Sequence, residues 1–381
     1  MAENKKHHYV PRFYLKLFSE NGRSINLFNL RIQRFVLDGA LKNQCYRDYF
    51  YGKDPQIEKA LSLVEGQISQ IFNKVQSNNI LPKRGSPDHI TLLMYILIQH
   101  ARTAYSAEMY DEQTDKIIKH LVAPELEDTN YSSEQIASVR VTLKNPARFA
   151  LSVAAPHYPL LVDLKLKLIR ATGAHGFITS DNPVVFYNQF LSFRKLVSNT
   201  GLASKGLLIF LPINPKQLII LYDEAVYGVG SKKCDVINVS DPRDVEQINR
   251  LQFVSALENI YYFDKSFPAF QEFKASERYR RTQKSRMQVF QNVRTGEQRQ
   301  DLIMISGEDI EIGLTLQFLR IIKPAKRWRK EFQASNSQPV AVVRNEILLK
   351  HYKDFLNLVD AGRYNHGEFT KYVREILLKN S

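Results

Sequence analysis

The residues best suited to chemistry lie at the start of the chain, where His7 and His8 are followed by Tyr9, Arg12 and Tyr14. Histidine titrates near neutral pH, so it can act as a general base, a metal ligand or a phosphate contact. The alternative is a structural role, in which the imidazoles bond to backbone groups and stack on the neighbouring tyrosines. This segment predicts a polar site but does not identify a reaction.

The position of His8 shortly before Pro11 is weakly similar to the first strand of the ββα-metal nucleases, in which a histidine precedes a proline. Those sites also need a metal-binding His or Asn on the following helix. Here the next residues offer Asn26 and Asn29, but no histidine occurs before His89. A divalent metal is therefore one option, and the cofactor is left undetermined.

A second candidate lies where a long apolar segment ends at Gln99 and Arg102. Their spacing places both side chains on one face of a helix. Polar groups at such a position are costly unless they are paired, and a planar guanidinium suits a carboxylate or a phosphate. A structural salt bridge to an acid on the sheet is the alternative.

The third candidate is the polar run Thr179, Ser180, Asp181 and Asn182, which follows a short apolar strand and precedes Pro183. Side chains at strand ends often bind ligands in α/β proteins, so Asp181 and Asn182 could hold a metal or a substrate. The alternative is a tight turn in which these side chains bond their own backbone.

The chain carries a formal net charge of +14 at pH 7, so nucleic acid or another polyanion is the expected partner. Basic residues gather in two runs beyond Lys265, around Tyr279 and Trp328, and such interleaving suits phosphate and base contacts. Solvated surface is the alternative. The candidate nucleic-acid contacts are Arg278, Arg280, Arg281, Lys284, Arg286, Lys326, Arg327 and Arg329.

Several classes of protein receive no support from the sequence. The two cysteines, Cys45 and Cys234, lie far apart without metal-ligand spacing, which argues against a disulfide scaffold and a zinc finger and fits a cytoplasmic location. We expect neither a signal peptide nor a membrane partner, because the start lacks an apolar stretch and the apolar runs are short. Gly-rich phosphate loops, Gly-x-Ser-x-Gly elbows and CxxC pairs are also absent from the sequence. The oligomeric state is left open.

The elements that position these residues can be read from caps and periodicity. A capping residue followed by proline predicts helices from Pro55, from Pro87 to about Val122, and from Pro242 to about Leu257. Further helices are expected over 344–360 and 367–378. Strands are expected over 25–30, 31–37, 160–170, 176–180, 206–212, 217–222, 236–239 and 260–263.

Together these elements predict an α/β protein of the α+β kind. It should have an N-terminal β-hairpin, central helices, a mostly antiparallel sheet of about five strands, and a basic, largely helical C-terminal part. The change in composition places a domain boundary at 265, with an α/β domain over 1–265 and a basic extension over 266–381.

Several of these stretches occur together in one known family. Five motifs fall in the expected order and, with Asn249, resemble the bacterial "domain of unknown function 4238" (DUF4238) over about residues 5–265. The resemblance implies membership and carries no activity that could be transferred. The basic tail is less typical of that pattern. The motifs are His7–Phe18, Tyr49–Tyr51 ahead of the helix that holds Glu58 and Glu65, Gln99–Thr103, Thr179–Pro183 and Leu211–Pro215.

The leading hypothesis is a phosphate- or nucleic-acid-directed protein, with a nuclease-like site where His8, Arg102 and Asp181 converge. His8, beside His7, would be the acid or base, Arg102 would stabilise the anionic transition state, and Asp181 would orient the histidine or hold a metal. Whether the chain is an enzyme stays undecided. The expected substrate-binding residues are Tyr9, Arg12, Tyr14, Gln99, Thr179, Ser180 and Asn182.

Two other functions are kept beside it. The first is a non-catalytic nucleic-acid-binding module, in which the same residues are structural hydrogen-bond hubs and binding weakens steeply with salt. The second is an interaction or sensor protein of antiviral defence, whose basic tail binds an acidic partner. Deleting the residues after Lys265 should then remove partner binding and leave the N-terminal fold intact.

Overall fold

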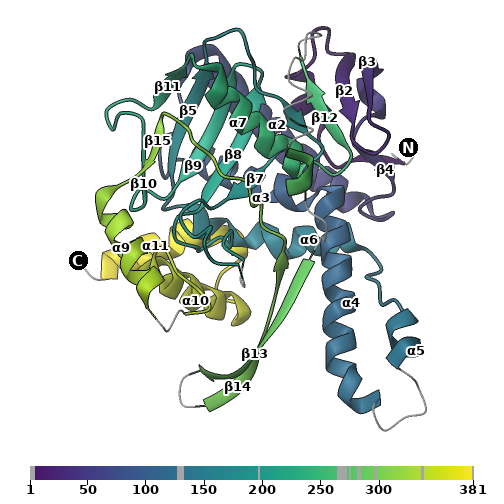
Figure 1. The fold of residues 1–381 in the computed structure, drawn as a ribbon, viewed down its shortest axis with the longest axis vertical. Helices are drawn as coiled ribbons and strands as arrows, with labels where there is room; N and C mark the ends of the chain where they lie inside the picture. Colours follow the sequence, from purple (N-terminus) through teal and green to yellow (C-terminus); the bar gives the residue numbers. More distant parts are fainter. Residues whose placement is uncertain are drawn as a thin grey trace.

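The computed structural model describes residues 5–126, 133–195, 198–263, 273, 276–280, 285–295, 298–335 and 339–379. A five-stranded sheet in the order β11-β5-β9-β8-β7 runs through the main body (Figure 1). Its neighbours are antiparallel except for the parallel pair β11 and β5. The strands are β5 Lys165–Ala171, β7 Val185–Tyr187, β8 Leu208–Asn214, β9 Gln217–Tyr222 and β11 Val236–Val239.

The sheet is buried on both faces, and alternate residues of its central strands enter two different cores. Ile209 of β8 and Ile219 of β9 belong to the first core, whereas Phe210 and Ile220 belong to the second. This alternation follows from the period of two in a β-strand. The first core is shared with α2 Pro55–Asn78 and α3 Pro87–Ala101. The second is shared with α7 Pro242–Ser255 and α9 Lys323–Ala334.

The N-terminal part forms two smaller sheets, and the predicted hairpin is one of their components. Strands β2 and β3 pair antiparallel, and β2 also pairs with β12, which pairs with β6. The second sheet pairs β1 with β4. The strands are β1 Lys6–His8, β2 Ser24–Asn29, β3 Arg34–Ala40, β4 Tyr46–Asp48, β6 Thr179–Ser180 and β12 Asn259–Tyr262.

The predicted helix from Pro87 to Val122 is wrong in one respect, because it is divided. Helix α3 ends at Ala101, and α4 Ala104–Leu126 begins two residues after Arg102. The hydroxyl of Thr103 accepts the Ser106 backbone N–H at 3.2 Å, which starts a new helix as an N-cap does. Figure 1 shows α4 extending away from the main body.

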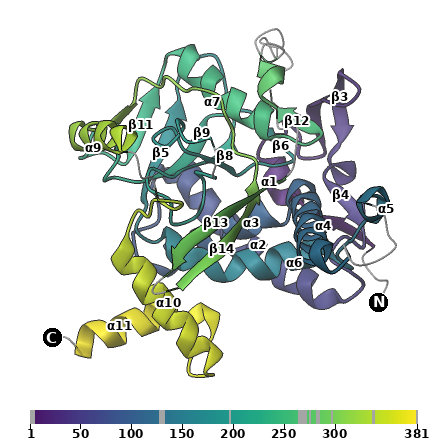
Figure 2. The same ribbon diagram turned by 60° about the horizontal axis from the view of Figure 1, so that its bottom comes forward.

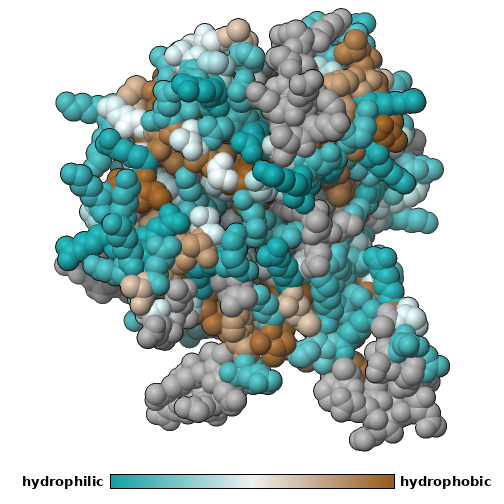
Figure 3. Space-filling model, in the orientation of Figure 1, coloured by the Kyte–Doolittle hydropathy of each residue, from teal (hydrophilic) through white to brown (hydrophobic). Residues whose placement is uncertain are grey.

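The C-terminal part contains an element that the sequence analysis missed. Strands β13 Ser285–Thr295 and β14 Gln298–Gly307 form an antiparallel hairpin that extends on the same side as α4 (Figures 1 and 2). The Lys116 ammonium of α4 donates to the Ser285 carbonyl at 2.6 Å, so the base of the hairpin lies against that helix. Hydrophobic side chains reach the surface between the two projections (Figure 3).

The last two helices confirm the prediction closely, as α10 Glu346–Asp360 and α11 Phe369–Lys379. They do not form a separate unit, because Phe355 and Tyr372 lie in the first core with α2 and α3. Among the described residues, no helix is long and apolar enough to cross a membrane. The remaining short elements are α1 Arg12–Lys16, α5 Ser133–Ser138, α6 Pro146–Ala154, β10 Tyr227–Val229 and β15 Leu319–Ile321.

Candidate functional site

The two histidines lie on β1 and are held by the strand–turn region that follows it. His7 is 4% exposed, its Nδ1 accepts the Tyr51 backbone N–H at 3.2 Å, and its ring stacks on Tyr51. His8 Nδ1 lies 3.0 Å from the Gln44 carbonyl. Burial lowers the pKa of His8, and the nearby Arg12 and Arg102 charges act in the same direction. His8 is therefore a neutral imidazole bonded to the backbone at pH 7.

Arg102 is the bulkiest buried side chain of the predicted site, with 2% of its side chain exposed. Its NH1 donates to Glu65 Oε1 at 2.7 Å, and its NH2 donates to the His8 carbonyl at 2.7 Å. Its Nε donates to the Tyr51 hydroxyl at 3.1 Å. The guanidinium thus connects the end of α3 to α2 and β1 through a structural salt bridge. The expected acid on the sheet is wrong, because the partner Glu65 lies on helix α2.

Asp181 is also buried, and three backbone amides occupy its carboxylate. Leu257 N–H donates to Oδ1 at 2.8 Å, while Glu258 and Asn259 N–H donate to Oδ2 at 2.7 and 2.9 Å. Burial raises the pKa of Asp181 to about 6, although the three amides favour the charged form. The side chain fixes the turn between α7 and β12.

The other residues of the predicted site form similar structural bonds. Thr179 Oγ1 lies 2.8 Å from the Tyr14 hydroxyl, which donates to the Pro212 carbonyl. Ser180 donates to Gln252 Oε1 at 2.9 Å, and Asn182 donates to the Ser255 carbonyl at 3.1 Å. Each bond joins segments that are distant in sequence.

The remaining members complete the pattern. Gln99 donates to the Tyr9 carbonyl at 3.1 Å, and Arg12 lies exposed on α1. The oxygens Gln99 Oε1 and Asn182 Oδ1 are buried without a hydrogen-bond partner among the described residues. The hydrogen-bond network lacks a partner at these two oxygens. A buried acceptor without a partner lowers the stability of the folded state.

The structure therefore brings His8 and Arg102 together and places Asp181 in a different network. The two networks approach each other around Tyr9 and Gln44. The Gln44 carbonyl bonds His8, and the Gln44 Oε1 accepts from the Tyr261 hydroxyl at 3.4 Å. Burial raises the pKa of Tyr9, and Cys45 and the Asp181 charge act in the same direction. Within the described ranges, no three or more His, Cys, Asp or Glu side chains are grouped so that they could hold a metal ion. A catalytic role for His7, His8, Arg102 and Asp181 stays a prediction.

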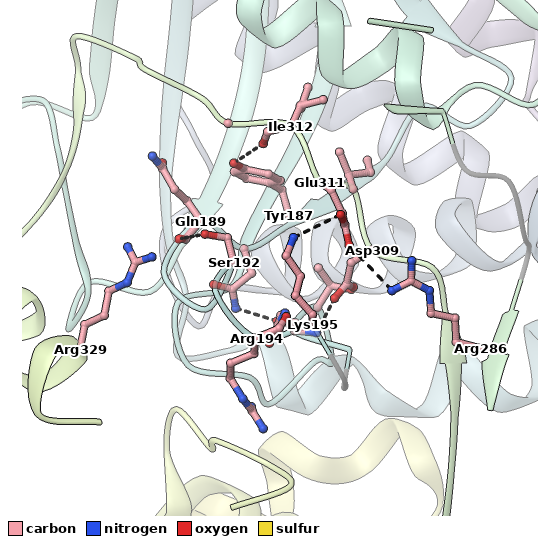
Figure 4. A pocket seen from close by; sticks show the side chains of 15 residues that line it. Tyr187, Gln189, Ser192, Arg194, Lys195, Arg286, Asp309, Glu311, Ile312 and Arg329 are labelled. Carbon is pink, nitrogen blue, oxygen red and sulfur yellow. Dashed lines mark hydrogen bonds and ion pairs between the residues drawn. The ribbon is translucent and has the colours of Figure 1, made fainter. Parts of the chain in front are cut away.

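Basic side chains converge elsewhere, on a cavity of about 350 Å³ that we call the basic cavity. Figure 4 shows Arg194, Lys195, Arg286 and Arg329 around it, contributed by the loop after β7, by β13 and by α9. The floor is polar: the buried Tyr187 donates its hydroxyl to the Ile312 carbonyl at 2.7 Å.

Acidic groups offset part of this charge. Lys195 pairs with Glu311 at 3.2 Å, and Arg286 pairs with Glu308 at 2.8 Å. Arg329 forms no ion pair with any described residue, and its guanidinium lies over the Phe193 ring at 5.2 Å. The cavity therefore holds a cation that an incoming anion can reach without breaking a salt bridge.

Beside the basic cavity, helix α9 lies on an aromatic cluster. Trp328 stacks on Phe190, with ring centroids 5.4 Å apart, and on Phe332 at 4.7 Å. Lys205 lies over Trp328 at 5.5 Å, and Arg194 lies over Phe332 at 6.0 Å. Cations and aromatic rings thus alternate over this surface, as the sequence around Trp328 suggested.

The structure separates the predicted nucleic-acid contacts. Arg286 and Arg329 line the basic cavity, and Lys326 is exposed on α9. Arg327 pairs with Glu331 on the exposed side of α9. Arg280 instead donates to the Ala256 and Leu257 carbonyls.

The other predicted contacts are not part of this surface. Arg278 lies over the ring of its neighbour Tyr279. Arg281 and Lys284 lie outside the described residues. Sequence reasoning missed Arg194 and Lys195, although the run Phe190 to Lys195 has the aromatic–basic interleaving that flagged the later segments.

These features define an α+β protein with hydrogen-bonded structural hubs in its N-terminal two thirds and a basic cavity whose wall is shared by residues 187–200 and residues 286–329. The family model described as "Protein of unknown function (DUF4238)" matches residues 6–266. Because that match covers more than half of the chain, the chain belongs to this family. A search of curated proteins gave no match. A search of solved structures gave no match either.

Proposed function

We propose that this protein binds nucleic acid without cleaving it, and that the phosphate backbone contacts the basic cavity and the exposed side of α9. The observation that supports this most directly is that Arg194, Lys195, Arg286 and Arg329 all line one cavity. Arg194 also donates to the Pro339 and Val340 carbonyls at 2.8 and 2.9 Å, so Arg329 is the more available of the two guanidinium groups that form no ion pair with a described residue. The net charge of +14 would add long-range attraction for a polyanion.

Single strands are the preferred ligand in this proposal. The rings of Phe193, Trp328 and Phe332 are partly exposed and lie among Arg194, Lys205 and Arg329. Proteins that bind single strands combine a positive groove with aromatic side chains on which bases stack, at about 1–3 kcal/mol per base. A duplex keeps its bases stacked inside and would use only the cations.

The nuclease-like alternative has weaker support. A general base must reach the substrate proton, and a transition-state clamp needs free donors. Arg102 uses three of its five N–H donors on Glu65, Tyr51 and the His8 carbonyl, and its burial restricts access to the others. Asp181 accepts three backbone amides. These contacts favour the binding module over an active site at this position.

The test uses the double variant Lys326→Gln/Arg329→Gln, with fluorescence anisotropy of a labelled single-stranded oligonucleotide measured across about 50–200 mM salt. Wild type should bind with a negative slope of log affinity against log salt. Loss of two phosphate contacts should weaken binding at every salt concentration and reduce the magnitude of that slope by about 1.4, at about 0.7 per contact on a single strand.

The matched control is Lys42→Gln/Lys59→Gln, which removes the same charge from exposed positions on the N-terminal part of the chain. It should leave the slope nearly unchanged. Equal weakening by both double variants would mean that net charge alone attracts the strand, and the proposal would fail. Cleavage of the oligonucleotide by wild type, lost in His8→Ala, would favour the nuclease-like alternative.

A further inference from the structure

A second cavity, of about 360 Å³, lies beside the basic cavity, and we call it the aromatic cavity. It opens where α4, α6, β7 and β14 come together. Its size falls at the lower end of the roughly 300–1,000 Å³ that is typical of small-molecule sites. Its apolar wall includes Leu97, Tyr105, Met109, Tyr110, Phe186 and Leu202.

One segment forms a wall of both cavities. Ser198 and Thr200 line the aromatic cavity, while Asn199 and Thr200 line the basic cavity. Asp309 fixes this segment: it accepts the Ser198 hydroxyl at 3.1 Å, the Asn199 N–H at 2.7 Å and the Thr200 hydroxyl at 2.7 Å. A ligand that contacts both cavities would therefore pass over residues 198–200, which Asp309 holds in place.

The polar groups of the aromatic cavity differ in kind from those of the basic cavity. Gln113 is 8% exposed and lines the cavity, and its amide offers two donors and an acceptor. Burial lowers the pKa of His157, and the Val153 carbonyl acts in the opposite direction but more weakly. The Nδ1 of His157 has no well-placed hydrogen-bond partner in the described part of the chain. Both groups are neutral at pH 7.

The carboxylate at the rim does not change this picture. Glu308 lines the aromatic cavity, but its Oε1 accepts from Arg286 at 2.8 Å, so much of its charge is compensated. Phe186 is buried and stacks on His100 with centroids 4.3 Å apart, which presents flat surfaces at the inner wall. The chemistry suits a planar, neutral ligand that both donates and accepts hydrogen bonds.

From this geometry we infer that the aromatic cavity accepts an unstacked nucleobase of the strand whose phosphates contact the basic cavity. The choice of a nucleobase rests on the proposed function, because the strand supplies planar heteroaromatic rings next to phosphates. The amide of Gln113 would bond the edge of the base, and the apolar wall would cover its faces.

The first experiment uses free nucleosides, which lack phosphate and so do not depend on the basic cavity. Adenosine, guanosine, cytidine and uridine are each titrated into the full chain by isothermal titration calorimetry. At least one should bind, and Gln113→Leu should weaken that binding by roughly tenfold, because a base edge is left without its partner. Ala154→Trp, which fills the cavity from α6, should abolish it.

Gln67→Leu is the matched control, because Gln67 is exposed on α2 and lines neither cavity. It should bind nucleosides as wild type does. Thermal unfolding of each variant establishes that it is folded, and Gln113→Leu should keep the wild-type melting temperature. The inference is overturned if none of the four nucleosides binds, or if binding is the same in wild type, Gln113→Leu and Ala154→Trp.

A second measurement separates this inference from the proposed function. A strand carrying one 2-aminopurine is titrated with wild type, Gln113→Leu and Lys326→Gln/Arg329→Gln. If the strand binds but the 2-aminopurine signal is the same for wild type and Gln113→Leu, the base-binding inference fails and nucleic-acid binding stands. If nucleosides bind and the strand does not, the proposed function fails and the aromatic cavity keeps its nucleoside site.

Discussion

At the scale of single residues, the polar side chains of the N-terminal motifs form hydrogen bonds that hold distant segments of the chain together. Arg102 joins α3 to α2 and β1, and Asp181 holds three amides at the junction of α7 and β12. Sequence reasoning could single out these residues, because buried polar types in apolar surroundings need partners. It could not identify the partners, since most of them are backbone groups that leave no trace in residue type.

Replacement of Arg102 by Met should destabilise the fold by about 3 kcal/mol, within the range found when one partner of a buried ion pair is removed. The loss arises because Glu65 and the Tyr51 hydroxyl lose a donor, and the His8 carbonyl keeps only the Tyr51 hydroxyl, at 3.3 Å, among the described residues. The effect is tempered because Glu65 is partly exposed and regains water. Urea unfolding followed by circular dichroism measures it. A variant of unchanged stability that no longer binds nucleic acid would instead give Arg102 a direct role in the ligand site.

The carboxyl of Asp181 should make stability depend on pH. Its pKa of about 6 in the folded protein exceeds the ordinary value of 3.8, so the folded state binds its proton more tightly than the unfolded state. This tighter proton binding adds about 3 kcal/mol to the free energy of unfolding below about pH 4. The added stability is lost as pH rises through 6.

The comparison for this carboxyl is Asp181→Asn, which cannot titrate. The free energy of unfolding of wild type minus that of the variant, measured by urea titration, should fall as pH rises from about 4 to about 6.5. A difference that stays flat with pH, or that rises, would mean that the three amide donors outweigh burial and hold the carboxylate charged.

At the scale of elements, capping chemistry was the most reliable signal in the sequence. Asp54, Ser86 and Asp241 each cap a helix whose first residue is proline, as predicted, and each side chain accepts a backbone N–H. The break after α3 was missed because residues 92–122 carry no Gly or Pro to mark it. Helix α3 ends where it does because the Arg102 side chain bonds to groups on other elements of the fold.

The hairpin β13–β14 was missed for a different reason. Met287 and Val289 alternate with polar residues, which is a strand signal, but they lie in a run that was interpreted as basic surface. Within the described part of the chain the hairpin pairs with no third strand, and it packs on α4. Its place against that helix, and hence the walls of both cavities, follows from long-range contacts that local patterns do not encode.

At the scale of the whole molecule, the basic C-terminal part is built into the fold. Ile310, Ile312 and Leu314 lie in the second core, and Phe355 and Phe369 lie in the first. The domain boundary at residue 265, which was placed by the change in composition, stays a prediction. The packing argues against an N-terminal fold that remains intact without the residues beyond it, because both cores would be opened to water.

A chain that ends at residue 265 should therefore unfold at a much lower temperature than the full chain, or fail to fold cooperatively. Each large buried aromatic side chain that is removed costs about 3–5 kcal/mol, and a typical domain is stable by only about 5–15 kcal/mol. Differential scanning calorimetry of the two chains measures the difference. A truncated chain that melts cooperatively near the full-length temperature would restore the view of two independent domains.

The two cavities take one side of their walls from the residues that the family model matches and the other from residues 286–329, beyond that match. Gln113, Arg194 and Lys195 lie within the matched residues, whereas Arg286 and Arg329 lie beyond them. Relatives that share the scaffold but carry a different tail would present different chemistry at the same place. Under the proposed function, differences in that tail would change the cations of the basic cavity without any change in the hydrogen-bond hubs of the common architecture.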